Sequence, residues 1–321
     1  MKKLINSIEK NKIFLLLSLI LIFCLVVLFI LIKNGEEKRK NDILIKNNKI
    51  RVEKIRKTKK IKWKNTFIRN MKSLDIKADS FLVQDLNSPD ILYSKNYQKK
   101  QSIASLTKIM TALLALENKN LQKIVIDKKD LIPEGEYFLQ PGEIFDKKDL
   151  VVFMLANSSN DAARALANSN SENVQKFIDK MNDFSIKIGL NSTLFFSDTG
   201  LDAANRIGGS YSSVQDINKL ILYFYKNFPK VSEQVAKFNI KICSNKICHD
   251  IENTNKLLTE KNNILFSKTG YTNFSGGSLA LIIKIKDRLY SIVILKSTKD
   301  GRFKDAGKII NSLTNLVENV D

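Results

Sequence analysis

Hydrophobic and polar positions divide the chain into three stretches with different patterns. Residues 13–32 form an apolar run in which Ser18 is the only clearly polar member, and a helix of about 20 residues spans roughly 30 Å, the thickness of a bilayer core. Residues 33–64 are rich in lysine and carry only scattered apolar side chains. From about residue 76, apolar positions recur at the spacings of amphipathic helices and buried strands. The pattern predicts a membrane helix, a polar connecting segment and one folded domain.

Within the folded part, the periodicity predicts strands at both ends and helices between them. We expect a strand hairpin over residues 80–86 and 91–94, with its turn at residues 87–90. Helices are expected over residues 103–117, 148–156, 161–167, 173–188, 214–225 and 304–316. Further strands are expected over residues 235–242, 264–268, 278–285 and 289–296. This order indicates an α+β domain in which helices flank an antiparallel sheet.

The patterns predict four segments, namely a cytoplasmic tail (1–12), a transmembrane anchor (13–32), a basic stalk or linker (33–75) and a folded domain (76–321). The apolar run ends without an Ala-x-Ala-like cleavage site, which favours an uncleaved anchor over a removed signal peptide. The count of flanking positive charges would keep the domain in the cytoplasm. Large domains behind a single amino-terminal anchor are nonetheless commonly exported, and we expect this domain on the extracytoplasmic side of the cell membrane.

The net charge of +20 is concentrated in the stalk, where residues 33–64 hold fourteen Lys/Arg against four Asp/Glu. The stalk is expected to be a solvated helical or disordered spacer, or to adhere to anionic lipid or wall polymer, and the two roles are compatible. Positive charge alone also suits nucleic acid but carries no specificity. The chain has neither zinc-finger spacing nor an aromatic RNA-binding motif, so we expect no nucleic-acid partner.

Cysteine and histidine are scarce. Cys243 and Cys248 bracket a predicted turn between two short strands, where they would either form a disulfide across the hairpin or remain free thiols. With His249 they offer three metal ligands and no fourth nearby, which is a poor zinc site, so we expect no metal and no cofactor. Because His249 is the only histidine, a Ser-His-Asp triad would have to use that one residue.

Candidate chemistry begins with Ser105 and Lys108, at i and i+3 of a predicted helix, where they share one face. Ser105 falls in the first turn, where backbone N–H groups and the helix dipole favour developing negative charge. Lys108 can act as a base only when it is neutral, which requires burial or a nearby cation. Lys268 is a candidate for that cation. The pair therefore fits a serine acyl-transfer site with lysine as the base.

A second motif, Ser158-Ser159-Asn160, falls between two predicted helices. From such a turn Ser158 can pass a proton to a leaving amine, and Asn160 can hold a substrate amide or orient Lys108. In isolation, the triplet fits an ordinary helix cap better than a catalytic role.

The third motif, Lys268-Thr269-Gly270, ends a predicted strand along which an extended substrate can lie. Lys268 and Thr269 can hold an anionic substrate end there, and Gly270 lets the backbone approach closely. Each motif is weak alone, because Ser7 and Lys10 in the tail repeat the spacing of the first. Three motifs in this order are a much stronger indication.

Longer blocks surround these motifs, at residues 104–112 (ASLTKIMTA), 158–163 (SSNDAA), 253–258 (NTNKLL) and 268–272 (KTGYT), with support from 199–201 (TGL) and 301–306 (GRFKDA). In these blocks the chain resembles the low-molecular-mass penicillin-binding proteins that act as serine D-alanyl-D-alanine carboxypeptidases. The resemblance covers about residues 76–318. It implies a β-lactamase/transpeptidase-like fold and makes residues 76–321 the catalytic domain.

Carried over by position, the resemblance implies nine site residues. The catalytic ones are Ser105 as nucleophile, Lys108 as general base, and Ser158 and Asn160 in the cleft. The substrate-binding ones are Lys268, Thr269, Gly270, Tyr271 and Arg302. Of these, residues 268, 269 and 302 are expected to bind the carboxylate of the terminal D-Ala, and the N–H groups of residues 105 and 271 to form the oxyanion hole.

The implied reaction removes the terminal D-Ala from peptidoglycan stem pentapeptides through an acyl-enzyme, which β-lactams would trap. Ser159 departs from the family pattern, because a glycine is usual there, and it is expected to narrow the cleft. We expect the amino-terminal helix to take over the membrane attachment that many relatives achieve at their carboxyl end.

Three alternatives remain. A DD-endopeptidase that cuts cross-links is chemically almost the same enzyme. A class A β-lactamase needs a glutamate well after the second motif, but Glu172 follows Asn160 too closely and no Glu occurs over residues 173–232. An inactive wall-binding module would not need the intact Ser105, Lys108 and Lys268.

Overall fold

The computed structural model describes residues 2–88, 90–133, 138–203 and 207–318, so Pro89 of the predicted turn lies outside the described residues. Contacts divide the chain into two compact units, residues 1–63 and 64–321. The second unit holds all nine candidate site residues.

Helix α1 (Lys2–Ser73) makes up the described part of the first unit and continues into the second. The large apolar side chains from Phe14 to Ile32 are all exposed, and an apolar surface all around a helix suits lipid rather than water. Among the described residues, α1 is the one helix long and apolar enough to cross a membrane. The stalk region belongs to the same continuous helix.

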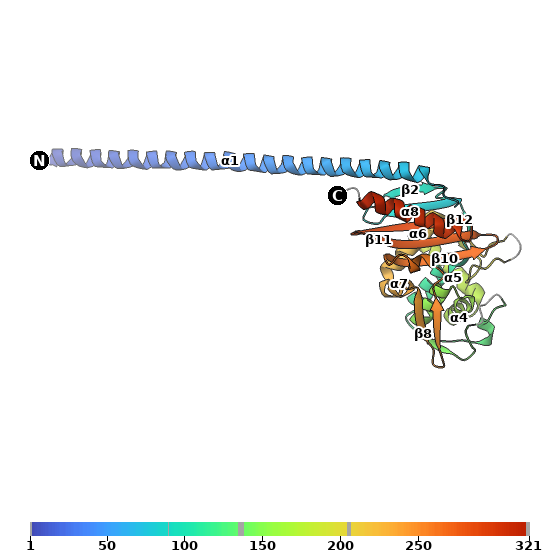
Figure 1. Cartoon of the computed structure of the whole chain (residues 1–321). Coiled ribbons are helices and arrows are strands. Elements are labelled where there is room, and N and C mark those ends of the chain that lie inside the picture. The colour runs from blue at the N-terminus through green and yellow to red at the C-terminus, as the bar shows by residue number, and fades with distance from the viewer. Residues whose placement is uncertain (1, 89, 134–137, 204–206, 319–321) are drawn as a thin grey trace. The chain divides into compact units, whose positions relative to one another are not determined.

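The second unit is built around an antiparallel sheet of five strands in the order β10-β11-β12-β1-β2. Figure 1 shows β10, β11 and β12 side by side. The strands are β1 (Ser80–Asp85), β2 (Ile91–Lys95), β10 (Ile264–Thr272), β11 (Gly276–Ile285) and β12 (Arg288–Ser297). Residues 279–283 and 291–295 are fully buried, because helices cover both faces of the sheet. Strand β10 lies at an edge of the sheet.

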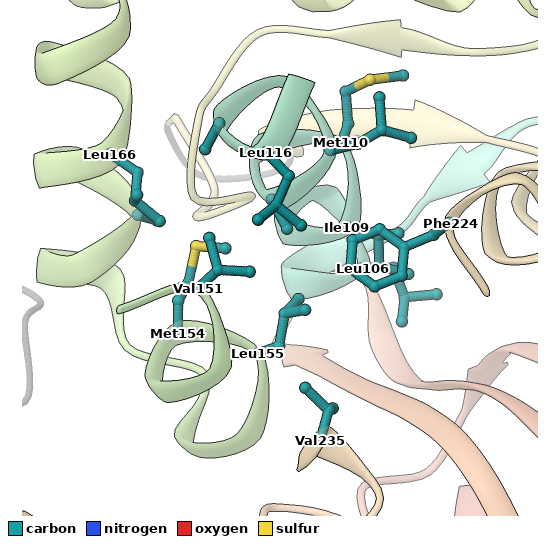
Figure 2. Packing of buried hydrophobic residues seen from close by; sticks show 14 of the residues in the cluster. Leu106, Ile109, Met110, Leu116, Val151, Met154, Leu155, Leu166, Phe224 and Val235 are labelled. Carbon is teal, nitrogen blue, oxygen red and sulfur yellow. The ribbon is translucent and has the colours of Figure 1, made fainter. Parts of the chain in front are cut away.

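The helices of this unit pack on the sheet and on one another. They are η1 (Ala104–Thr107), α2 (Lys108–Glu117), η2 (Lys128–Asp130), α3 (Lys147–Asn157), α4 (Asn160–Asn170), α5 (Val174–Lys187), α6 (Val214–Asn227), α7 (Pro229–Val235), η3 (Lys256–Thr259) and α8 (Gly301–Glu318). Helix α6 packs on β1, β11 and β12, and α8 packs on β11 and β12. Figure 2 shows labelled members of the buried core cluster, among them Leu106, Ile109, Val151 and Leu155.

Burial of this core positions the candidate site. Leu106, Ile109 and Met110 flank Ser105 and Lys108 in sequence and are fully buried. Each such side chain stabilises the fold by about 1.5–3 kcal/mol. Packing of these side chains therefore fixes the position of the turn from η1 into α2, which carries Ser105 and Lys108.

Short strands complete the unit: β3 (Gln101–Ser102), β7 (Ser210–Ser212) and β6 (Leu194–Phe195) in one sheet, β4 (Lys123–Val125) with β5 (Ile144–Asp146), and β8 (Asn239–Cys243) with β9 (Cys248–Glu252). The predicted hairpin at residues 243–248 is confirmed, and a disulfide joins Cys243 to Cys248 across it. Two residues of this hairpin contact Glu143. His249 Nε2 lies 2.8 Å from Glu143 Oε1, which also accepts a hydrogen bond from Ser244 Oγ at 2.7 Å.

One predicted element is wrong at its start. The strand expected over residues 235–242 begins only at Asn239, because Val235 ends helix α7. Pro229 occupies the first turn of α7, where its fixed φ and missing N–H cost nothing. Strand β10 also runs four residues beyond the expected range, so the Lys-Thr-Gly motif lies within the strand rather than at its end.

Candidate active site

Ser105 lies in the 3-10 turn η1, and Lys108 begins α2 directly after it. Ala104, the residue before Ser105, has φ of 48°, a left-handed conformation that is strained for a residue with a side chain. The spacing brings Lys108 Nζ within 3.0 Å of Ser105 Oγ. The predicted contact between these two side chains is therefore present.

Lys108 is fully buried and contacts two further oxygen atoms. Its Nζ donates to Asn160 Oδ1 at 2.7 Å and to the carbonyl oxygen of Thr199 at 2.8 Å. Asn160 is the first residue of α4, so the second motif reaches the first through this contact. Contacts with three oxygen atoms, from Ser105, Asn160 and Thr199, thus hold the amine of Lys108 in place.

The second motif forms the tight turn between α3 and α4. Ser158 has φ of 71° and ends α3 in a left-handed conformation. Ser159 is buried and its Oγ accepts a hydrogen bond from the backbone N–H of Ala162 at 3.2 Å. This serine acts as a helix N-cap, so its side chain is engaged by the backbone of α4.

The third motif brings a second buried lysine to the same turn. Lys268 Nζ donates to Ser158 Oγ at 2.9 Å and to the Thr269 carbonyl oxygen at 2.8 Å. The hydroxyl groups of Thr269 and Thr254 lie 2.6 Å apart. The Ser-x-x-Lys, Ser-x-Asn and Lys-Thr-Gly motifs, more than 100 residues apart at their extremes, therefore meet in one place.

Gly270 lets β10 approach the Ser105 turn. A Cβ atom at Gly270 would lie 2.9 Å from the Ile103 carbonyl oxygen and 3.1 Å from the Ser105 nitrogen, closer than side chains normally allow. On the other side, Arg302 from α8 donates from Nη1 to the Gly270 carbonyl oxygen at 2.7 Å. Burial lowers the pKa of the Arg302 guanidinium from its usual value. Tyr271 follows in β10 and is partly exposed.

Comparison with known proteins shows a family match over most of the chain. Residues 65–298 match the S11 peptidase family model, described as D-alanyl-D-alanine carboxypeptidase. The chain belongs to this family. The resemblance and the transpeptidase-like α+β fold expected from the sequence are confirmed, and the protein is an S11 hydrolase with a penicillin-binding-protein fold.

The names of individual relatives give two different activities, endopeptidase and carboxypeptidase. The chain is 29% identical to a D-alanyl-D-alanine endopeptidase of Escherichia coli, over 73% of this chain and 76% of that protein. It is 30% identical to the D-alanyl-D-alanine carboxypeptidase DacF of Bacillus subtilis, over 73% of this chain and 61% of that one. A solved structure of penicillin-binding protein D2 from Listeria monocytogenes, in an ampicillin-bound form, matches with a TM-score of 0.66 and 26% identity, covering 75% of this chain and 98% of that one.

Two features of this S11 site were not predicted from the sequence. One is the Thr199 carbonyl oxygen that binds Lys108, since a backbone acceptor needs no particular side chain. The other is Asp198, which is fully buried and receives two hydrogen bonds from Arg164, at 2.7 and 3.0 Å. The Asp198 carbonyl oxygen also accepts from Thr111 Oγ1 at 2.6 Å. These contacts hold the segment that presents Thr199.

Among the described residues, no group of three or more His, Cys, Asp or Glu side chains is arranged to hold a metal ion. His249 is next to Glu143, and both cysteines beside it are in the disulfide.

Proposed function

We propose that the protein is a serine D-alanyl-D-alanine carboxypeptidase in which Ser105 is the nucleophile and Lys108 the general base. The contacts of Lys108 Nζ carry the proposal. Asn160 Oδ1 and the Thr199 carbonyl oxygen can only accept hydrogen bonds. A neutral amine that donates to both directs its lone pair toward the Ser105 hydroxyl, 3.0 Å away. Complete burial disfavours the ammonium form and so supports a neutral Lys108.

The third motif supplies positive charge for the substrate. Lys268 and Thr269, with Arg302, bind the carboxylate of the terminal D-Ala in this proposal, supported by the approach of Lys268 to Ser158. The backbone N–H groups of Ser105 and Tyr271 stabilise the oxyanion of the tetrahedral intermediate. The close approach of β10 to the Ser105 turn at Gly270 supports this pairing.

In the proposed reaction, Ser105 Oγ attacks the carbonyl carbon of the penultimate D-Ala while Lys108 takes the hydroxyl proton. Ser158 relays a proton to the departing amine of the last D-Ala. Water then hydrolyses the ester and restores the serine. A β-lactam acylates Ser105 in the same way and remains attached longer, because its leaving group stays tethered.

The substrate requires an extracytoplasmic domain, with residues 13–32 as the membrane anchor behind the 1–12 tail and residues 33–75 as the stalk. The exposed apolar surface of α1 supports the anchor. The Cys243–Cys248 disulfide supports the location of the domain, since disulfides persist mainly in oxidising compartments.

A DD-endopeptidase is the second candidate, because the relatives from Escherichia coli and Pseudomonas aeruginosa carry that name and the chain covers 76% of each. The acyl-enzyme is the same in both activities. The difference lies in the leaving group, which is free D-Ala in one case and a cross-linking amine in the other.

Parallel assays of the detergent-solubilised chain separate the two. We expect D-Ala release from an acyl-D-Ala-D-Ala peptide, little cutting of a cross-linked peptide dimer, and neither activity in Ser105→Ala. Faster cutting of the dimer would replace the carboxypeptidase with the endopeptidase. Rapid turnover of benzylpenicillin would instead identify a β-lactamase, and complete inactivity of a folded chain would leave a wall-binding module.

A further inference from the structure

The positive charge of the stalk lies in the part that is farther from the apolar run. Residues 33–42, directly after that run, hold four Lys/Arg against three Asp/Glu, a net charge of +1. Residues 43–64 hold ten Lys/Arg against a single acidic residue, Glu53, a net charge of +9. We call residues 43–64 the cationic segment. The reaction proposed above gives this segment no role.

The cationic segment is helical, and its charged groups are in contact with water. It belongs to α1, which Figure 1 shows as one continuous helix. Residues 2–73 contain no proline, the residue that most often causes a sharp kink. Glu53 pairs with Lys57 at 3.0 Å, but both side chains are mostly exposed, and exposed pairs of this kind are weak. The described basic side chains that are exposed in this segment are Lys46, Lys49, Arg51, Lys54, Lys57 and Lys62.

Distance along the helix separates the cationic segment from a bilayer that holds residues 13–32. At 1.5 Å per residue, residue 43 lies about 16 Å beyond residue 32 along the axis, and residue 64 lies about 48 Å beyond it. A tilt of about 40° from the bilayer normal would lower these heights by only about a quarter. The charge of anionic lipid is screened over about 8 Å at physiological salt. A stalk that binds lipid headgroups carries its basic residues directly beside the membrane span, where this chain has a net charge of only +1.

The basic side chains are also spread around the helix. At 3.6 residues per turn, the six exposed ones occupy about 220° of the circumference. A flat surface contacts only part of such an arc, whereas a flexible polymer can wind around the helix and contact all of it. Eight of the ten basic residues are lysines, which bind phosphate as a point charge and need no fixed geometry in the partner.

We propose that the cationic segment binds a flexible linear polyanion outside the membrane, a wall polymer that carries a phosphate group on each repeating unit. The segment is about 33 Å long, so its net charge of +9 amounts to about one positive charge for every 4 Å of axis. The assignment rests on the extracytoplasmic location proposed above and not on the chemistry at Ser105. Its function is to retain the enzyme in the wall that contains its substrate.

Binding of a fluorescent poly(glycerol phosphate) chain to the full-length protein, in nanodiscs of zwitterionic lipid, tests the proposal. We expect the affinity to fall about 100-fold to 1000-fold between 50 and 200 mM salt, as counterion release from about six phosphate contacts requires. A variant that combines Lys46→Gln, Lys49→Gln, Lys54→Gln and Lys57→Gln is expected to bind on the order of 100-fold more weakly at 150 mM salt. Glutamine has nearly the helix propensity of lysine, so circular dichroism should show an intact α1.

The matched control removes four charges beside the apolar run, through Lys33→Gln, Lys38→Gln, Arg39→Gln and Lys40→Gln. It is expected to weaken polymer binding less than about fivefold, because residues 43–64 keep their net charge of +9. Equal losses in the two variants, or wild-type binding in the first one, would overturn the assignment. Penicillin should acylate Ser105 equally in all three chains. A wild-type chain that binds the polymer but is not acylated would overturn the proposed function and leave this assignment standing.

Trp63 shows whether the cationic segment lies on the bilayer, because it is the only tryptophan of the chain. It lies about 47 Å along the helix axis from residue 32. In nanodiscs of phosphatidylglycerol, we expect the same Trp63 fluorescence with brominated as with unbrominated acyl chains. Quenching by the brominated lipid would place the segment on the membrane and would overturn the assignment to a wall polymer in favour of anionic lipid.

Discussion

Gly200 offers a test of how the Thr199 carbonyl oxygen controls Lys108. It has φ of 82°, and an added Cβ would lie 2.1 Å from the Ala104 carbonyl oxygen and 2.6 Å from Thr107 Oγ1. Contacts of this kind normally exceed 3.0 Å, so in Gly200→Ala one of the two segments must move by about 1 Å to restore van der Waals distance. Either movement changes the position of Thr199 relative to Lys108.

Gly189→Ala separates this clash from the cost of the backbone conformation. Gly189 also has a left-handed φ, 74°, but an added Cβ there would meet nothing within 4 Å. Both substitutions are expected to cost about 1–2 kcal/mol of stability through φ alone. Gly200→Ala should lose about 1–3 kcal/mol more through overpacking.

The decisive measurement is the second-order rate constant for acylation by a fluorescent penicillin, with urea denaturation as the measure of stability. A misplacement of about 1 Å in catalytic geometry can cost on the order of 100-fold in rate. We expect that loss in Gly200→Ala and an unchanged rate in Gly189→Ala. Equal acylation rates in the two folded variants would refute a role for the Thr199 carbonyl oxygen in positioning Lys108.

Three further perturbations have expected outcomes. Replacing Cys243 and Cys248 by Ser should cost about 2 kcal/mol of stability for so short a loop and leave the penicillin acylation rate unchanged, as urea denaturation and the labelling assay would reveal. Burial raises the pKa of Tyr290 to about 12, so the folded state retains a proton that the unfolded state loses near pH 10, and stability should fall between about pH 10 and 12. Tyr290→Phe should abolish that fall and should not lower stability at pH 7, since the hydroxyl has no hydrogen-bond partner among the described residues; a large loss at pH 7 would contradict this. Arg164→Gln leaves the buried Asp198 with a weaker partner and should destabilise the domain by about 2–3 kcal/mol, whereas unchanged stability would show that the pair contributes little.

The long elements of the fold were predictable because burial imposes a clear period on them. Strands β11 and β12 and helix α6 follow the expected ranges closely, since their apolar positions repeat over ten or more residues. Strands such as β3 and β6 have two residues each and carry no period. Helix α7 was missed because its seven residues lie directly before the apolar run of β8.

Within the site, the sequence predicted which side chains come together, but it did not predict the backbone conformations or the backbone atoms that contact them. The Ser105–Lys108 contact was predictable because residues three apart on a helix share a face. The left-handed conformations of Ala104 and Ser158 were not, since neither residue type favours them. The contact of Lys108 with the Thr199 carbonyl oxygen could not be predicted either, because any residue at that position supplies the same atom.

The central claim is that Ser105 carries the acyl group and that Lys108 activates it. Intact-mass measurement after incubation with benzylpenicillin, followed by peptide mapping, tests it most directly. We predict one adduct on Ser105, none in Ser105→Ala, and a loss of about 100-fold to 10,000-fold in acylation rate for Lys108→Gln. An adduct on another residue, or wild-type acylation in a folded Lys108→Gln chain, would contradict the account.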